Sequence, residues 1–225
     1  MKRSSLPCFA AALLFASMLS GRISAARREQ NPKKPDVVQI GDERFRIGSI
    51  VVDLKKGAAT CPGRINMQRG TIEYLAVGPG GKLHESALRL ETEAVQLQVA
   101  LILLGLEPGG GLRFQGDTQS PKGSPIVIRV SWTRNGRSVT VPAGELVWDI
   151  RKRRAVGASP WVFTGWGEND RYEGEDAHSL IATYRDPAAV ANISTPEGVD
   201  DTVYKVNERM APPRSTPVTV TLSRR

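Results

Sequence analysis

The sequence predicts an α+β protein in which a mostly antiparallel β-sheet packs on one buried helix at about residues 93–104, followed by a β-rich C-terminal half. Three observations predict this class. Short runs rich in β-branched and aromatic residues follow one another between turn residues along most of the chain. One longer segment lacks Gly and Pro and is bounded by residues that start and stop helices. The chain that follows an N-terminal export segment, about 200 residues, is long enough to bury a substantial core.

Residues 1–26 have the order of features of a cleavable secretory signal peptide. Lys2 and Arg3 precede an apolar run over residues 6–19, which is shorter than the ~20 residues that a membrane-spanning helix needs. Cleavage after Ala26 places small side chains at the positions that require them. We therefore expect an exported protein, periplasmic or extracellular, whose mature chain has no membrane span.

The two cysteines and the charge follow from this segment. Cys8 lies near the start of the apolar run, whereas a lipid-modified cysteine follows it, so we expect no lipoprotein. Cys61 is the only cysteine of the mature chain, which excludes an internal disulfide. The formal net charge of +8 includes three basic residues of the signal peptide.

Residues 27–36 (RREQNPKKPD) are polar and basic with two prolines, which is typical of a disordered leader. The globular domain is expected from residue 37 to residue 225. Strands are predicted at 37–40, 45–52, 71–77, 83–90, 111–114, 126–132, 138–141, 161–164, 178–184 and 217–222.

The predicted helix at 93–104 (EAVQLQVALILL) follows Thr92 as its N-cap and ends at Gly105, with Pro108 just beyond. It is apolar on nearly every face, so we expect it to be buried against the sheet at the centre of the first half. Residues 116–124 (GDTQSPKGS) are the most plausible internal boundary, and a single domain with a long loop there is equally consistent. A short helical turn is predicted at 188–191.

One stretch resembles a known family. Glu73-Tyr74-Leu75 leads through residues 81–86 (GKLHES) to residues 100–105 (ALILLG), and this order of features is similar to that of the YdjY-like domain family. The similarity continues through Trp132, residues 161–165 (WVFTG) and Asp176, so it covers most of the mature chain. The resemblance implies an exported bacterial protein without an assigned activity. The chain departs from the family where Trp166 follows Gly165, since members more often have Gly-Ser there.

The first candidate site is formed by Lys82, His84, Glu85 and Ser86, because an imidazole, a carboxylate and a hydroxyl could act in general-base or nucleophilic catalysis. In an extended segment His84 and Ser86 share one face and Glu85 points to the other, so the three cannot form a local triad. The alternative is that His84 and Glu85 satisfy backbone groups near the glycine-rich turn.

A metal site is the second candidate. His178 follows Glu175 and Asp176, and with His84 and Glu85 these side chains could complete a zinc-type coordination shell. No HExxH motif or cysteine cluster fixes such a spacing, so no cofactor is expected. The alternative is a solvated loop leading into the next strand.

Two basic or glycine-rich motifs receive structural interpretations. Residues 78–82 (GPGGK) lack the Gly and the Ser or Thr that complete a phosphate loop, so an ordinary hairpin turn is the better account. Residues 151–154 (RKRR) carry no interleaved aromatic residue, and an exported protein rarely meets nucleic acid. We expect a solvated loop there and no nucleic-acid partner.

Aromatic residues form the last candidate. Trp161, Trp166 and Tyr172 could make a stacking platform for a sugar or peptide. Trp161 alternates with Phe163 as core-facing strand residues do, which favours packing, and Trp166 is expected to be partly exposed. The leading hypothesis is a non-enzymatic binding or structural module of the cell envelope with an unknown protein or ligand partner. A His-based or metal-dependent hydrolase and a carbohydrate or peptide binder are the alternatives.

Overall fold

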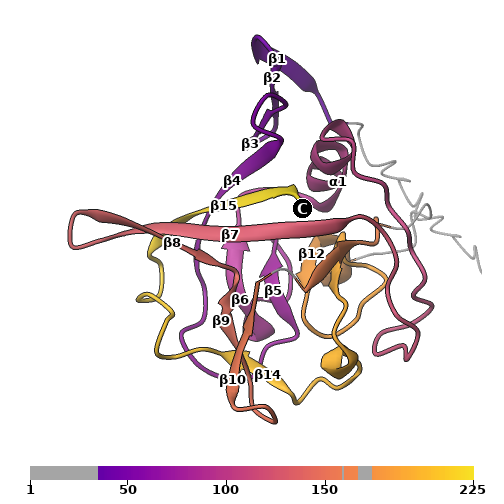
Figure 1. Ribbon diagram of the computed structural model, residues 1–225, viewed down its shortest axis with the longest axis vertical. Helices are drawn as coiled ribbons and strands as arrows, with labels where there is room; N and C mark the ends of the chain where they lie inside the picture. The colour runs from indigo at the N-terminus through magenta and orange to yellow at the C-terminus, as the bar shows by residue number, and fades with distance from the viewer. Residues whose placement is uncertain (1–34, 159, 167–173) are drawn as a thin grey trace, which may run out of the picture. The chain divides into compact units, whose positions relative to one another are not determined.

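The computed structural model describes residues 35–158, 160–166 and 174–225. Their fold is built almost entirely from β-strands (Figure 1). The strands are β1 (Val37–Gly41), β2 (Arg44–Ile47), β3 (Ile50–Asp53), β4 (Ala58–Ile65), β5 (Tyr74–Val77), β6 (Ser86–Leu90), β7 (Pro125–Arg134), β8 (Arg137–Pro142), β9 (Gly144–Asp149), β10 (Arg154–Gly157), β11 (Trp161–Phe163), β12 (Ser179–Ala182), β13 (Ala191–Ile193), β14 (Tyr204–Val206) and β15 (Pro217–Arg224). The helices are α1 (Ala94–Leu103) and the 3₁₀ turns η1 (Leu83–Glu85), η2 (Gly174–His178) and η3 (Pro196–Val199).

The predicted α+β class is wrong, because the main sheet closes on itself into an eight-stranded barrel instead of lying open on a helix. Its strands follow the order β4, β15, β7, β11, β13, β12, β5 and β6, and pairing of β6 with β4 completes the ring. Closure leaves the eight strands without an open edge and encloses the hydrophobic core. The core consists largely of Ile, Leu and Val side chains, together with Trp161 and Phe163.

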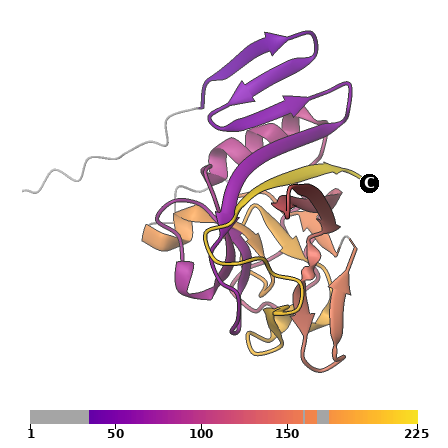
Figure 2. The same cartoon turned by 90° about the vertical axis from the view of Figure 1, so that its left-hand side faces the viewer.

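The helix was predicted at the right place but with the wrong role. α1 begins after Glu93, whose backbone N–H donates to Gln96 Oε1 at 3.2 Å, and ends before Gly105, which has a φ of +76°. It packs beside the barrel against β2, β3 and β12 (Figure 2), with one buried face and most of its other side chains partly covered. Ile102 is 49% exposed, so the helix is not the centre of the fold.

Several local predictions need correction. The predicted strand at 45–52 is the hairpin of β2 and β3, because Gly48 turns the chain with a φ of +56°. Residues 111–114 form a loop, and the predicted helical turn at 188–191 is a turn that enters β13. The glycine-rich segment after β5 is not a hairpin turn, because β5 and β6 pair in parallel.

The long connection between α1 and β7 contains the predicted boundary at 116–124. The buried guanidinium of Arg185 holds this connection, because its Nη1 donates to the carbonyl oxygens of Asp117, Thr118 and Gln119 at 3.0 to 3.1 Å. Its Nη2 donates to the carbonyl oxygen of Thr195 at 3.0 Å. The loop is therefore fixed to the segment that follows β12.

A second, three-stranded sheet has the order β10, β9 and β14. The strands β7 and β8 form a long hairpin whose end extends beyond the barrel, and the small sheet lies below it in Figure 1. Among the described residues, no helix is long and apolar enough to cross a membrane.

Candidate functional site

The four residues of the first predicted site differ in their burial and in the contacts of their side chains. Residues 83–85 form η1 instead of an extended strand, and Ser86 begins β6. Ser86 is fully buried, and its hydroxyl donates to the carbonyl oxygen of Lys82 at 2.8 Å. The His84 side chain is 69% exposed, and its Nε2 lies 3.6 Å from Glu85 Oε2. No triad is formed, and Ser86 has a structural contact.

Lys82 instead lies at the centre of what we call the Lys82 cluster, which consists of Lys82, Tyr74, Glu85, Asp176 and Asp186. Its ammonium group is 2.9 Å from Asp176 Oδ1 and 4.0 Å from Glu85 Oε1, and it donates to the Tyr74 hydroxyl at 3.4 Å. That hydroxyl donates in turn to Asp186 Oδ2 at 2.6 Å. Hydrogen bonds and ion pairs within the cluster join β5, η1, η2 and the segment after β12.

Burial decides the electrostatics of this cluster. It raises the pKa of the Asp186 carboxyl, although the hydrogen bonds from Tyr74 and from the Ala188 backbone N–H oppose the change. Burial and the negative charge of Asp186 raise the pKa of the Tyr74 hydroxyl. Burial lowers the Lys82 pKa, but its ion pair with Asp176 outweighs that effect and the net pKa is raised. Tyr74 and Lys82 therefore keep their protons near neutral pH.

The two histidines have different surroundings. His84 faces Glu85, whereas the His178 ring lies against the turn before η1, where a Cβ added to Gly80 would be 3.1 Å from its Nε2. His178 Nδ1 is buried without a hydrogen-bond partner. Within the described ranges, no group of three His, Cys, Asp or Glu side chains could hold a metal ion. The side chain of Glu175, the remaining candidate ligand, is outside the described part.

The three predicted aromatic residues do not form a described platform. Trp161 is fully buried, and its indole N–H donates to the carbonyl oxygen of Ala182 at 3.2 Å. Trp166 is half-buried and packs against the core, so part of its side chain is exposed. Tyr172 lies outside the described residues. The burial of Trp161 removes its ring from any surface that a ligand could reach.

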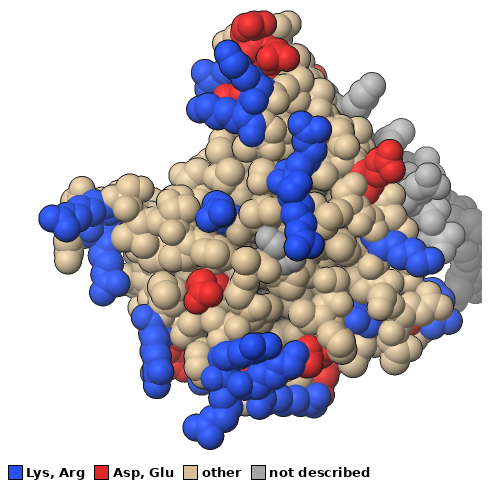
Figure 3. All heavy atoms as spheres, in the orientation of Figure 1, with Lys and Arg blue, Asp and Glu red and all other residues tan. Residues whose placement is uncertain are grey.

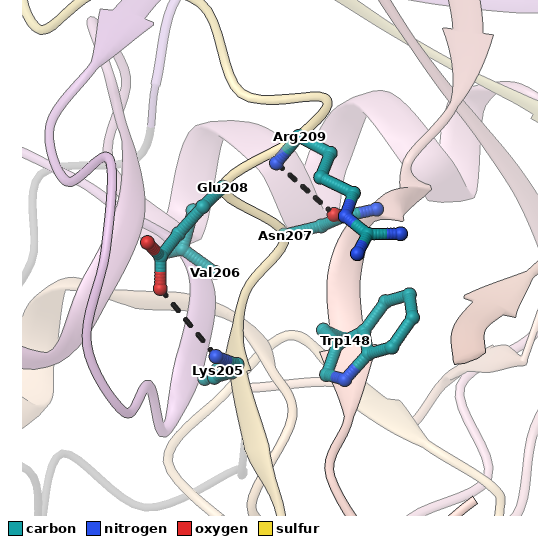
Figure 4. Close-up of a pocket in the computed structure, with 6 residues that line it drawn as sticks. All are labelled: Trp148, Lys205, Val206, Asn207, Glu208 and Arg209. Atoms are coloured by element: carbon teal, nitrogen blue, oxygen red, sulfur yellow. Dashed lines mark hydrogen bonds and ion pairs between the residues drawn. The ribbon is translucent and has the colours of Figure 1, made fainter. Parts of the chain in front are cut away.

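A surface cleft lies instead on the three-stranded sheet, and we call it the Trp148 cleft. It has a volume of about 290 Å³ and is lined by Trp148 of β9 and by β14 with the turn that follows it. Figure 4 shows the Arg209 guanidinium extending toward the side of the cleft where the Trp148 ring lies. The six lining residues are Trp148, Lys205, Val206, Asn207, Glu208 and Arg209.

Strand pairing explains why the indole is available. Trp148 stands directly opposite Lys205 on one neighbouring strand and Ala155 on the other. Cross-strand partners share a sheet face, and the methyl group of Ala155 is too small to cover an indole ring. Trp148 consequently remains partly exposed although both neighbouring strands are paired.

Asn207 fixes the turn that carries Arg209. Its side-chain amide donates to the carbonyl oxygen of Glu145 at 2.8 Å, and its backbone N–H donates to Leu146 O at 2.8 Å. Its side-chain oxygen accepts from the Arg209 backbone N–H at 3.3 Å (Figure 4). These bonds attach the turn to β9, so Trp148 and Arg209 are held on one framework.

A second cleft adjoins the first, and we call it the Trp132 cleft. It has a volume of about 440 Å³ and shares Arg209 with the Trp148 cleft. The end of the β7–β8 hairpin forms one wall, and the Pro-containing segment before β15 forms the other. Its lining includes Trp132, Arg134, Arg209, Met210 and Pro212.

The sequence contained only weak signals for these clefts. Trp148 was one of four tryptophans, but β9 was not predicted, so its ring had no assigned face. Arg209 lies in a segment without regular structure, far in sequence from Trp148. The pairing of β9 with β14 brings them together, and nothing local in either segment indicates that pairing.

Comparison with known proteins supports one assignment. Neither the curated proteins nor the solved structures contain a match to the chain. The model of the YdjY domain matches residues 50–223, which is more than half of the chain and confirms the resemblance carried by residues 73–105. The chain therefore belongs to the YdjY domain family.

Proposed function

We propose that this protein is an exported, non-enzymatic binding module and that the Trp148 cleft is its binding site. The observation that carries the proposal is the contrast between the side-chain groups of the Lys82 cluster and those of the Trp148 cleft. Those of the Lys82 cluster are bonded to one another, whereas the Trp148 ring and the Arg209 guanidinium line an open cleft.

The internal pairing of the Lys82 cluster argues against a catalytic role. The Tyr74 hydroxyl both accepts from Lys82 and donates to Asp186, and Tyr74 is fully buried. A general acid or base must reach the proton that it transfers, within hydrogen-bond distance or through one water molecule. The Asp186 side chain is buried with both oxygens accepting hydrogen bonds, from Tyr74 and from Ala188. These contacts are those of a structural network that joins segments.

The Trp148 cleft combines the two groups that binding sites use most. A tryptophan supplies a large, rigid apolar face, and a guanidinium supplies several donors for an anionic group. Clefts with a rigid aromatic anchor and a few convergent polar groups are typical of ligand sites. Export is supported by the signal-peptide features of residues 1–26.

The proposal is tested by a binding panel that covers three chemistries: an acidic oligosaccharide, its neutral counterpart and an acidic peptide. Binding is measured by quenching of tryptophan fluorescence and by calorimetry for the wild type, Trp148→Ala and Lys82→Met. We expect at least one ligand to bind, Trp148→Ala to weaken that binding about tenfold, and Lys82→Met to retain it. Binding that survives Trp148→Ala but disappears in Lys82→Met would contradict the proposal, as would the absence of any binding.

A further inference from the structure

The Trp148 cleft and the Trp132 cleft meet at Arg209, which lines both. The shared residue makes the two clefts neighbours, one at the small sheet and the other at the end of the β7–β8 hairpin, and we call them together the path. The two volumes, about 290 and 440 Å³, exceed what a single small ring fills. The path therefore suits an extended ligand better than a compact one.

Two of the three basic side chains that line this path lack an ion pair among the described residues. Lys205 pairs with Glu208 at 3.4 Å, but Arg134 and Arg209 have no ion pair within residues 35–158, 160–166 and 174–225. Arg134 and Arg209 are exposed, so a ligand can reach both guanidinium groups. Figure 3 shows further Lys and Arg gathering at the end of the β7–β8 hairpin and around the β9–β10 hairpin. An anionic ligand is favoured at both ends of the path.

The backbone beside the Trp148 cleft is not free to pair with a peptide strand. One edge of β14 pairs with β9, and the other is covered by residues 70–72, because Ile72 N–H donates to Tyr204 O and Val206 N–H donates to Gly70 O, each at 3.0 Å. Recognition of an extended peptide by strand addition requires such a free edge. Recognition must therefore come from side chains, namely a flat ring and separated guanidinium groups.

We propose that the path over both clefts binds an acidic polysaccharide, and this inference rests on the proposed function. One sugar ring stacks on Trp148, the carboxylate of the same unit or the next pairs with Arg209, and a later carboxylate pairs with Arg134. Guanidinium groups match carboxylates through two parallel hydrogen bonds, and aromatic rings cover the apolar faces of sugars at a small cost in side-chain entropy. Repeated carboxylates along one chain can pair with both arginines at once.

The test is calorimetric titration of the protein with a hexamer of galacturonic acid, its fully methyl-esterified form and the galacturonic acid monomer. We expect the hexamer to bind at least tenfold more tightly than the monomer, and the ester to lose most of that affinity. Raising the salt concentration should weaken hexamer binding, because exposed charges are screened. A hexamer that binds no better than the monomer or the ester would overturn the inference.

Matched variants locate the ligand. Arg134→Ala should weaken hexamer binding about two- to fivefold and leave monomer binding unchanged, whereas Arg137→Ala, its cross-strand partner outside the clefts, should change neither more than twofold. Arg209→Glu should weaken binding about tenfold, and Arg214→Ala, exposed in the same segment, should have little effect. Arg209 is exposed, so its variants test the idea even if Trp148→Ala fails to fold. Equal effects within either pair would overturn the inference.

Failure of this inference can be distinguished from failure of the proposed function. If an acidic peptide or a neutral sugar binds with full dependence on Trp148 while the hexamer does not, the inference fails and the proposed function stands. If Trp148→Ala changes the binding of no ligand, both fail.

Discussion

Replacing Asp186 with asparagine should remove a pH dependence of stability that originates in the Lys82 cluster. Burial raises the pKa of this carboxyl above its ordinary value in the folded state. The replacement preserves the shape of the side chain, its oxygen can still accept from the Ala188 N–H, and its amide can donate to the Tyr74 hydroxyl. The variant should therefore fold, with the charge lost and the direction of the hydrogen bond to Tyr74 reversed.

The direction in which stability changes with pH follows from proton binding. Between the carboxyl pKa of the unfolded chain, about 3.9, and the raised pKa of the folded state, the folded protein binds more protons than the unfolded chain. The stabilising contribution of Asp186 is thus fully present at acidic pH and is lost as the pH rises through the folded pKa. One such group changes the free energy of unfolding by at most about 1.4 kcal/mol per pH unit. In a fold of this size, that corresponds to about 3 to 5 °C in the melting temperature per pH unit.

The assay is urea unfolding, followed by circular dichroism, at half-unit intervals from pH 2 to pH 8. Asp186→Asn should flatten the decline of wild-type stability with rising pH. Asp200→Asn is the control with the opposite sign, because hydrogen bonds from Thr202 lower the Asp200 pKa, so its contribution is lost as the pH falls. A decline that is the same in the wild type and Asp186→Asn would refute the reasoning about burial.

Three further predictions concern the fold. Gly144→Ala should prevent stable folding, because the added Cβ would lie 1.9 Å from the Gly157 carbonyl oxygen. Gly136→Ala, where φ is +73° but the space is open, should lower the free energy of unfolding in urea by only about 1 kcal/mol. Equal losses of stability in the two variants would contradict this. Cys61 should not react with Ellman's reagent at pH 8 until urea unfolds the chain, since burial raises its pKa to about 11, and rapid reaction in the native state would contradict the packing. Arg185→Met should lower the free energy of unfolding by about 3 kcal/mol or more, because four carbonyl oxygens lose their donor. It should also expose the 106–124 connection to proteolysis. A variant as resistant to protease as the wild type would contradict this prediction.

The elements that were predicted correctly are those whose signals are local. α1 was found because Gly105 and the absence of breakers mark its ends, and β15 was found because its alternation of valine and threonine is clear in the sequence. β4 was missed because Pro62 and Gly63 interrupt it. Pro62 pairs with Thr219 inside the sheet, and Gly63 is required because a Cβ there would be 2.6 Å from the Arg89 carbonyl oxygen.

Barrel closure and the candidate sites depend on contacts distant in sequence. No local pattern indicates that β4 pairs with both β15 and β6, which is the pairing that closes the ring. The predicted candidates Lys82, Glu85 and Asp176 are three members of one cluster, but Asp186 was not among the predicted site residues. The Trp148 cleft was missed because its two sides come from strands that were not predicted.

The most direct test of the binding site is a two-dimensional ¹H–¹⁵N spectrum of the labelled protein, titrated with the galacturonic acid hexamer. We expect shifts of the Trp148 indole N–H and of the amides of residues 205–211, followed by shifts of residues 132–135 as the polysaccharide fills the second cleft. Amides near Tyr74 and Lys82 should stay in place. Shifts confined to residues 74–86 and 176–186 would contradict the account and make the Lys82 cluster the binding site.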